Sequence, residues 1–109
     1  LTPERLFERQ WALALLERVL MRLRDEYVTA GKQDHFETLH PFLSTDRENA
    51  NYSDASKSLN CTVDAARAAA RRLRHRYRQL LRDEIADTVA LPEQIDEEIR
   101  HLFDVLSNN

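Results

Sequence analysis

Apolar residues recur at spacings of three, four and seven along most of the chain, which is the repeat of one face of an α-helix. The first such stretch follows Thr2, which can cap a helix that has Pro3 at its first position, and it ends at Gly31, a residue suited to a C-terminal cap. We therefore predict a long opening helix from Pro3 to about Ala30, with a wide apolar face on which several other elements pack. The residues of this face are Leu6, Leu13, Leu16, Leu20, Leu23 and Tyr27, flanked by Phe7, Trp11, Leu15 and Val19.

Two shorter helices are predicted in the middle of the chain. One covers Asp34–Leu39 and is broken or kinked by Pro41, because proline cannot continue a helix. The polar stretch Ser44–Ala50 predicts a loop. The other helix begins at Asn51, which has the spacing of a capping box with Asp54. In the first segment the residues expected to face the core are Phe36, Leu39, Phe42 and Leu43, and in the second helix Tyr52, Ala55 and Leu59 fall on one side.

A tight break, Asn60-Cys61-Thr62, precedes the next predicted helix, which runs from Val63 to about Val89. Asn60 tolerates the left-handed backbone conformation that a helix end requires, and Thr62 can cap the helix that follows. The apolar face of this helix consists of Ala66, Ala70, Leu73, Tyr77, Leu80, Leu81 and Ile85. Its first two turns carry only alanine on that face, so another helix can approach closely there.

A final helix is predicted over Pro92–Leu106, with one apolar stripe of Ile95, Ile99, Leu102 and Leu106. Because an isolated helix of this length is marginal in water, we expect the stripe to pack against the opening helix or against another copy of the chain. The patterns together predict an all-α chain of five helices without a sheet, forming a single helical domain over residues 1–109. The residues expected to be most buried are Trp11, Leu16, Leu20, Leu73 and Tyr77.

The composition supports this prediction and narrows the cellular setting. One glycine and three prolines in 109 residues favour long helices. The single cysteine, Cys61, excludes an internal disulfide and is expected to pack as a small apolar residue. No signal peptide and no apolar run of the roughly 18–20 residues that span a bilayer are visible, so we expect no membrane contact and a cytoplasmic location. Because the sequence starts at Leu1 rather than at methionine, we expect it to be part of a longer protein.

Charge is distributed unevenly along the chain. The net charge is −3, yet the segment Arg67–Arg82 holds seven arginines and no acid. Arg67, Arg71, Arg74, Arg78 and Arg82 share one helical face, and no acid at a spacing of three or four pairs with them before Asp83 and Glu84. Unpaired like charges on adjacent turns repel one another, so this face favours an anionic partner such as DNA. A basic face that is simply solvated is the alternative.

Residues 51–89 have the spacing of a helix-turn-helix, whose second helix enters the major groove of DNA. Arg67 and Arg71 lie in the first turns of that helix, where a guanidinium can bind guanine through two hydrogen bonds, and Asp64 can accept one from cytosine. Arg74 and Arg78 lie farther along and are expected over phosphates, which position the helix.

Other chemistry has little support in the sequence. The four histidines are scattered over different elements, and no cysteine or carboxylate arrangement completes a metal site with them. A single glycine excludes a glycine-rich phosphate loop. No constellation of nucleophile, acid and base is visible. We therefore predict no catalytic activity, no cofactor and no bound metal.

The segment NYSDASKSLNCTVDAARAAARRLRHRYRQLLRDEI resembles region four of RNA polymerase sigma factors of the extracytoplasmic-function type. Members of that family carry a Tyr-x-Glu-aliphatic-Ala-x-x-Leu-Gly run, a short turn, a Ser- or Thr-capped helix and a run that ends in Arg-Leu-Arg. Here Arg72-Leu73-Arg74 stands at that end, and Asn60 replaces the turn glycine. The resemblance covers about a third of the chain.

The resemblance implies a three-helix, helix-turn-helix core without a wing, extended by the long N-terminal helix and by the C-terminal helix. It implies that this core reads the promoter element near minus thirty-five in double-stranded DNA and touches core RNA polymerase during transcription initiation. An anti-sigma protein is a further candidate partner. The residues that it places at the DNA are Thr62, Val63, Asp64, Arg67 and Arg71. The alternative is a protein-interaction module that keeps the fold without binding DNA.

Overall fold

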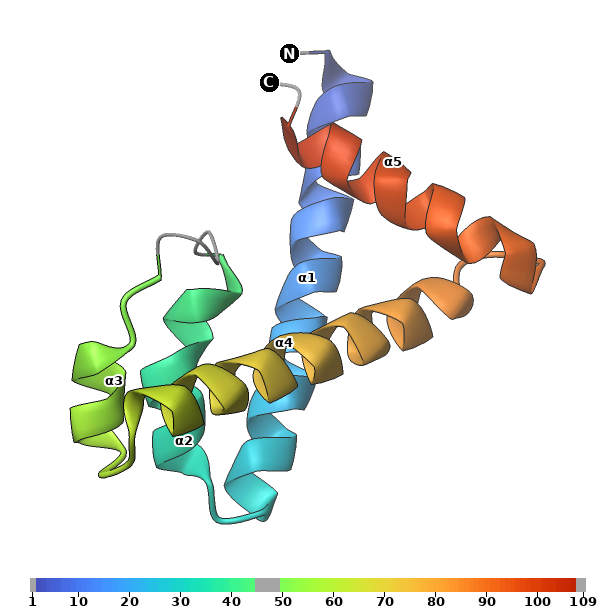
Figure 1. Cartoon of the computed structure of the whole chain (residues 1–109). Helices are drawn as coiled ribbons and strands as arrows, with labels where there is room; N and C mark the ends of the chain where they lie inside the picture. The colour runs from blue at the N-terminus through green and yellow to red at the C-terminus, as the bar shows by residue number, and fades with distance from the viewer. Residues whose placement is uncertain (1, 45–49, 108–109) are drawn as a thin grey trace. The chain divides into compact units, whose positions relative to one another are not determined.

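The computed structural model describes residues 2–44 and 50–107 (Figure 1). All regular elements of these residues are helical, and no strand occurs among them, so the predicted all-α chain of five helices is confirmed. The α-helices are α1 (Pro3–Thr29), α2 (Gln33–Leu39), α3 (Ser53–Ser58), α4 (Val63–Ala86) and α5 (Ile95–Ser107). Two short 3-10 helices are added, η1 (His40–Leu43) and η2 (Pro92–Gln94). Within the described residues no helix has both the length and the apolar character needed to cross a membrane.

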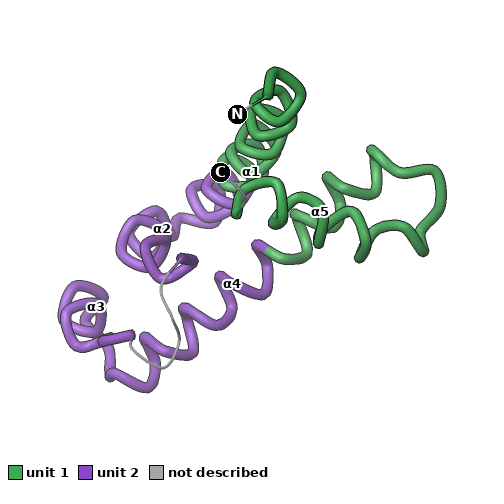
Figure 2. Tube along the Cα trace, turned by 90° about the horizontal axis from the view of Figure 1, so that it is seen from above, with its two compact units in different colours: residues 1–22, 78–109 green, residues 23–77 purple. Residues whose placement is uncertain are grey.

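The chain divides into two compact units (Figure 2). The terminal unit consists of residues 1–22 and 78–109, and the central unit of residues 23–77. The helices α1 and α4 contribute residues to both. That the chain folds as a single domain over residues 1–109 stays a prediction.

The terminal unit contains most of α1, the end of α4 and α5. Its buried apolar side chains are Ala12, Leu15, Val19, Leu80, Leu81, Ile85 and Leu102. The Glu84 carboxylate of α4 accepts a hydrogen bond of 3.1 Å from Arg22 and lies 3.6 Å from Arg18 Nε. One carboxylate therefore pairs with two arginines of α1.

The helix α5 is tied to both other helices of this unit. His101 Nε2 lies 3.6 Å from the Glu8 carboxylate of α1, and Leu102 beside it is fully buried. Of the stripe predicted to pack, Leu102 is buried and Ile95, Ile99 and Leu106 are half-buried, and which surface the stripe packs against stays a prediction. On α4, Arg82 donates a hydrogen bond to Asp96, and this bond is the main cause that lowers the pKa of Asp96 below its ordinary value. The pair stabilises the folded chain fully at pH values above the ordinary carboxyl pKa. This stabilisation is lost as the pH falls through the lowered pKa of Asp96.

The central unit is built around aromatic contacts. The Phe36 ring lies 6.2 Å from that of Tyr27 and 5.3 Å from that of His40, and Phe42 stacks on Tyr52 at 4.6 Å. The α-helix α2 ends just before the 3-10 turn that contains Pro41, as predicted. The buried side chains of this unit are Leu23, Phe36, Leu39, Tyr52, Ala55, Ser56, Ala66, Ala69, Ala70 and Leu73.

The structure corrects the predicted rotation of α1. The buried row is Ala12, Leu15, Val19 and Leu23, whereas Leu6 and Leu13 of the predicted face are 48% and 50% exposed. Of the five residues predicted to be most buried, Leu73 is fully buried, and Trp11, Leu16, Leu20 and Tyr77 are half-buried. The reason is that apolar residues surround most of this helix, so periodicity alone does not single out the strip that packs. For Tyr77 the partial burial still suffices to raise the pKa of its phenol.

The start of α3 also differs from the prediction. Its N-cap residue is Tyr52 and no side chain caps it. The Asn51 side chain instead accepts a hydrogen bond of 2.9 Å from the Ser53 N–H, one residue earlier than a capping box with Asp54 requires. Of the predicted loop Ser44–Ala50, residues 45–49 lie outside the described part of the chain.

With α1 rotated as observed, alanine substitutions of two nearby leucines are expected to lower the free energy of unfolding by different amounts. Leu15→Ala removes a fully buried side chain and is expected to lower the free energy of unfolding by about 2–5 kcal/mol. Leu13→Ala, the matched control, removes a half-exposed one and is expected to cost less than about 0.5 kcal/mol. Urea denaturation measures both. Equal losses would show that the helix is turned differently.

Candidate nucleic-acid interface

The connection between α3 and α4 is fixed by backbone geometry. Asn60 adopts the left-handed conformation, with φ of 53°, as predicted. The Asn60 N–H donates to the Lys57 carbonyl at 3.2 Å, and the Cys61 N–H donates to the Ser56 carbonyl at 2.9 Å. These two bonds form a Schellman motif, which satisfies the last carbonyls of a helix and turns the chain sharply. The turn therefore sets where α4 starts.

A threonine cap fixes the first turn of α4. The Thr62 hydroxyl accepts a hydrogen bond of 3.0 Å from the Ala65 N–H, which confirms the predicted cap. Asp64 follows in the first turn, where a negative charge is favourable to the helix dipole. The prediction for Cys61 is wrong, because its side chain is exposed in the turn; a tight turn at the surface leaves no core for it to enter.

The buried face of α4 determines which residues point outward. Ala66, Ala70 and Leu73 have no exposed surface. The opposite face therefore carries the residues predicted to bind DNA. Of these, the exposed ones in the central unit are Thr62, Val63, Asp64, Arg67 and Arg71. Arg74 is half-buried, and Arg78 is exposed in the terminal unit.

Arg67 is held by two neighbours. Its guanidinium donates a hydrogen bond of 2.7 Å to the Asp64 carboxylate, and its Cζ lies 5.6 Å from the centre of the Tyr52 ring. The prediction that no acid pairs with this arginine is wrong, because Asp64 precedes it at the i,i+3 spacing of helical ion pairs. Both side chains are largely exposed, 47% for Arg67 and 93% for Asp64. Such a pair contributes about 0–1 kcal/mol, so opening it for another ligand costs little.

Tyr52 also contacts a second arginine of this face. Its ring is 3% exposed, and its hydroxyl accepts a hydrogen bond of 3.2 Å from Arg74 Nη1. The apolar pattern placed Tyr52 on one side of the helix with Ala55 and Leu59, and of these Tyr52 and Ala55 are buried and Leu59 is half-buried. The contacts with Arg67 and Arg74 join different elements, so no local spacing in the sequence indicates them.

Other arginines of the basic segment have acidic partners too. Arg76 binds the Glu26 carboxylate through two hydrogen bonds of 2.8 and 2.7 Å, and Arg82 binds Asp96. Arg71 and Arg78 have no ion pair or hydrogen bond with residues 2–44 and 50–107. Within the stripe, Arg67 and Arg82 are therefore paired with acids, whereas Arg71, Arg74 and Arg78 have no ion pair with an acid of the described residues.

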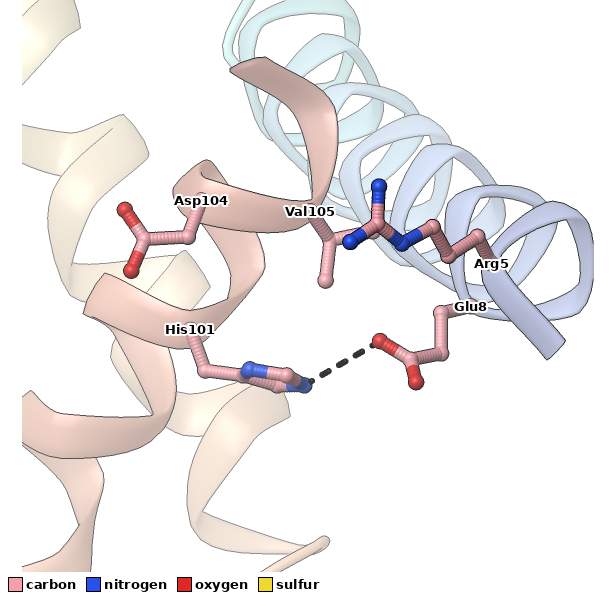
Figure 3. A pocket seen from close by; sticks show the side chains of 5 residues that line it. All are labelled: Arg5, Glu8, His101, Asp104 and Val105. Carbon is pink, nitrogen blue, oxygen red and sulfur yellow. Dashed lines mark ion pairs between the residues drawn. The ribbon is translucent and has the colours of Figure 1, made fainter. Parts of the chain in front are cut away.

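A pocket in the terminal unit is a weaker candidate for a functional site than the outward face of α4. Its lining side chains come from α1 and α5 and are Arg5, Glu8, His101, Asp104 and Val105 (Figure 3). The His101 and Glu8 side chains that pair across it are each about half exposed, and none of the lining residues is a hydroxyl or thiol nucleophile. Among the described residues, no group of three His, Cys, Asp or Glu side chains could hold a metal ion.

Comparison with known protein families, with curated proteins and with solved structures finds no match to this chain. The likeness of residues 51–85 to a sigma-factor segment therefore stays a hypothesis about the family. The candidate interface is described by its geometry alone: a turn closed by Asn60, a helix capped by Thr62, and an outward face that carries Arg67 and Arg71.

The left-handed backbone at Asn60 predicts opposite effects for two substitutions. Asn60→Gly is expected to keep or raise the melting temperature, because glycine has no Cβ to strain this conformation. Asn60→Ala is expected to lower the free energy of unfolding by about 1–2 kcal/mol. Thermal denaturation followed by circular dichroism measures both. If alanine were tolerated as well as glycine, the turn would not depend on the positive φ.

Proposed function

We propose that this chain is a DNA-binding module of a sigma-like transcription factor, with α3 and α4 acting as a helix-turn-helix. The observation that carries the proposal is the outward face at the start of α4. There Arg71 is exposed and has no ion pair or hydrogen bond with the described residues, and Arg67 beside it is held by Asp64. The buried alanine face of α4 fixes this presentation. A helix presented in this way can enter a major groove with its first turns toward the base edges.

Each residue of this face has a chemical role in the proposal. Arg71 donates two hydrogen bonds to the O6 and N7 atoms of a guanine. Asp64 accepts from a cytosine amino group, and Val63, which is 40% exposed, contacts a thymine methyl group. The hydroxyl of Thr62 and the remaining donors of Arg74 contact phosphates, which fix the register of the helix.

The transcriptional role rests on the resemblance to region four of sigma factors. In this proposal the module reads the promoter element near minus thirty-five, and the protein acts with core RNA polymerase in a bacterial cytoplasm. The net charge of −3 does not oppose this role, because the binding face is locally basic and phosphate contacts depend on local charge. The acidic remainder of the chain disfavours nonspecific contacts away from α4.

A second candidate function is docking of a protein partner, which a different observation favours. On α1, Phe7 is 74% exposed, and Leu6 and Leu13 are each about half exposed. Exposed apolar side chains grouped on one helix are typical of protein-interaction surfaces. The polymerase or an anti-sigma protein would be such a partner, and this surface is compatible with DNA binding by α4.

The proposal predicts that two adjacent arginines behave differently. A duplex is first selected with the wild-type chain from a random-sequence library. Arg71→Ala is expected to weaken binding to that duplex by about 1–3 kcal/mol and to relax the preference at one position. Arg72→Ala removes the same charge about 100° around the helix, because α-helical residues are 3.6 to a turn, and it should keep the preference.

Fluorescence anisotropy titrations at several salt concentrations, with selected and scrambled duplexes, measure the effect. Salt-independent binding, or equal loss of preference in the two variants, would contradict the DNA-binding role of this face.

A further inference from the structure

We infer that Tyr52 is the positioning residue of the interface, with its ring holding a base-reading arginine and its hydroxyl holding a phosphate-binding one. The inference rests on the proposed function and deepens it, because it names one shared support for Arg67 and Arg74.

Tyr52 is itself buried and packed against another ring. It is 3% exposed and stacks on Phe42 of η1, with ring centres 4.6 Å apart. Arg67 and Arg74 both contact it, and each long arginine side chain would otherwise sample many rotamers in water. The contacts with Tyr52 order the two arginine side chains before DNA binds. Binding therefore loses less side-chain conformational entropy, which is the general benefit of preorganisation.

The two contacts use different parts of Tyr52. Arg67 lies over the ring at 5.6 Å and needs the aromatic face. Arg74 donates to the hydroxyl at 3.2 Å and needs the oxygen. Each guanidinium has five N–H donors, so most of them are left for DNA after these contacts. The two roles can thus be separated by removing the hydroxyl alone.

The two arginines lie about 10 Å apart along the axis of α4, as seven residues rise 1.5 Å each. The first turns of a recognition helix reach base edges, whereas later turns approach the backbone of the DNA. Arg67 is therefore assigned to bases and Arg74 to a phosphate. Loss of the ring should then change sequence preference, and loss of the hydroxyl should change only the electrostatic part of binding.

The test compares Tyr52→Phe with wild type in anisotropy titrations on selected and scrambled duplexes. Tyr52→Phe keeps the ring and is expected to weaken binding to both duplexes equally, by about 3- to 10-fold, and to reduce the slope of log affinity against log salt by about one. The ratio between the two duplexes should not change. In an Arg74→Ala background, Tyr52→Phe should have no further effect.

Tyr52→Leu, checked for wild-type helicity by circular dichroism, is expected to lose sequence preference as well. If that variant does not fold, the inference is tested by the Tyr52→Phe and Arg74→Ala measurements alone. An unchanged salt slope in Tyr52→Phe, or a loss confined to the selected duplex, would overturn the inference while wild type still binds DNA. Absence of salt-dependent binding by wild type would instead overturn the proposed function, and this inference with it.

Discussion

The rotation of α4 about its own axis is fixed by the packing of its apolar face. Its buried face, with Ala66, Ala70 and Leu73 fully inaccessible, permits only one rotation, since a shift by one residue would carry an arginine into the interior. Burying an unpaired guanidinium costs far more than any surface contact returns. The direction of Arg67 and Arg71 is therefore a consequence of the apolar packing, and the same helix supplies Leu80 and Ile85 to the core of the terminal unit.

The fold could be predicted where the local chemistry is decisive. Gly31 and Asn60, both with positive φ, and Thr62, whose hydroxyl caps α4, mark helix ends through short-range effects that the sequence displays directly. The face of α4 could be predicted as well, because its apolar and charged residues are sharply separated. The face of α1 could not, since apolar residues surround most of that helix and only tertiary packing selects Leu15 over Leu13.

The candidate site was predictable in outline and incomplete in detail. The exposed positions of Thr62, Asp64, Arg67 and Arg71 follow from helical periodicity. The ion pair between Asp64 and Arg67 could also be predicted, because the two residues are three positions apart on one helix. The contacts of Tyr52 with Arg67 and Arg74, and that of Glu26 with Arg76, join elements far apart in the chain. Only the three-dimensional arrangement reveals which arginines of α4 have such partners.

Backbone amide NMR during titration with a random-sequence DNA duplex shows whether the first turns of α4 bind DNA, as we propose. Even nonspecific binding, with dissociation constants of about 10⁻⁴–10⁻⁶ M, is detectable in this way. We expect the largest chemical-shift changes over residues 61–75, and we expect these changes to diminish as salt is added and to be absent from α5. Changes centred on the exposed apolar residues of α1, or no salt-dependent change in α4, would contradict it.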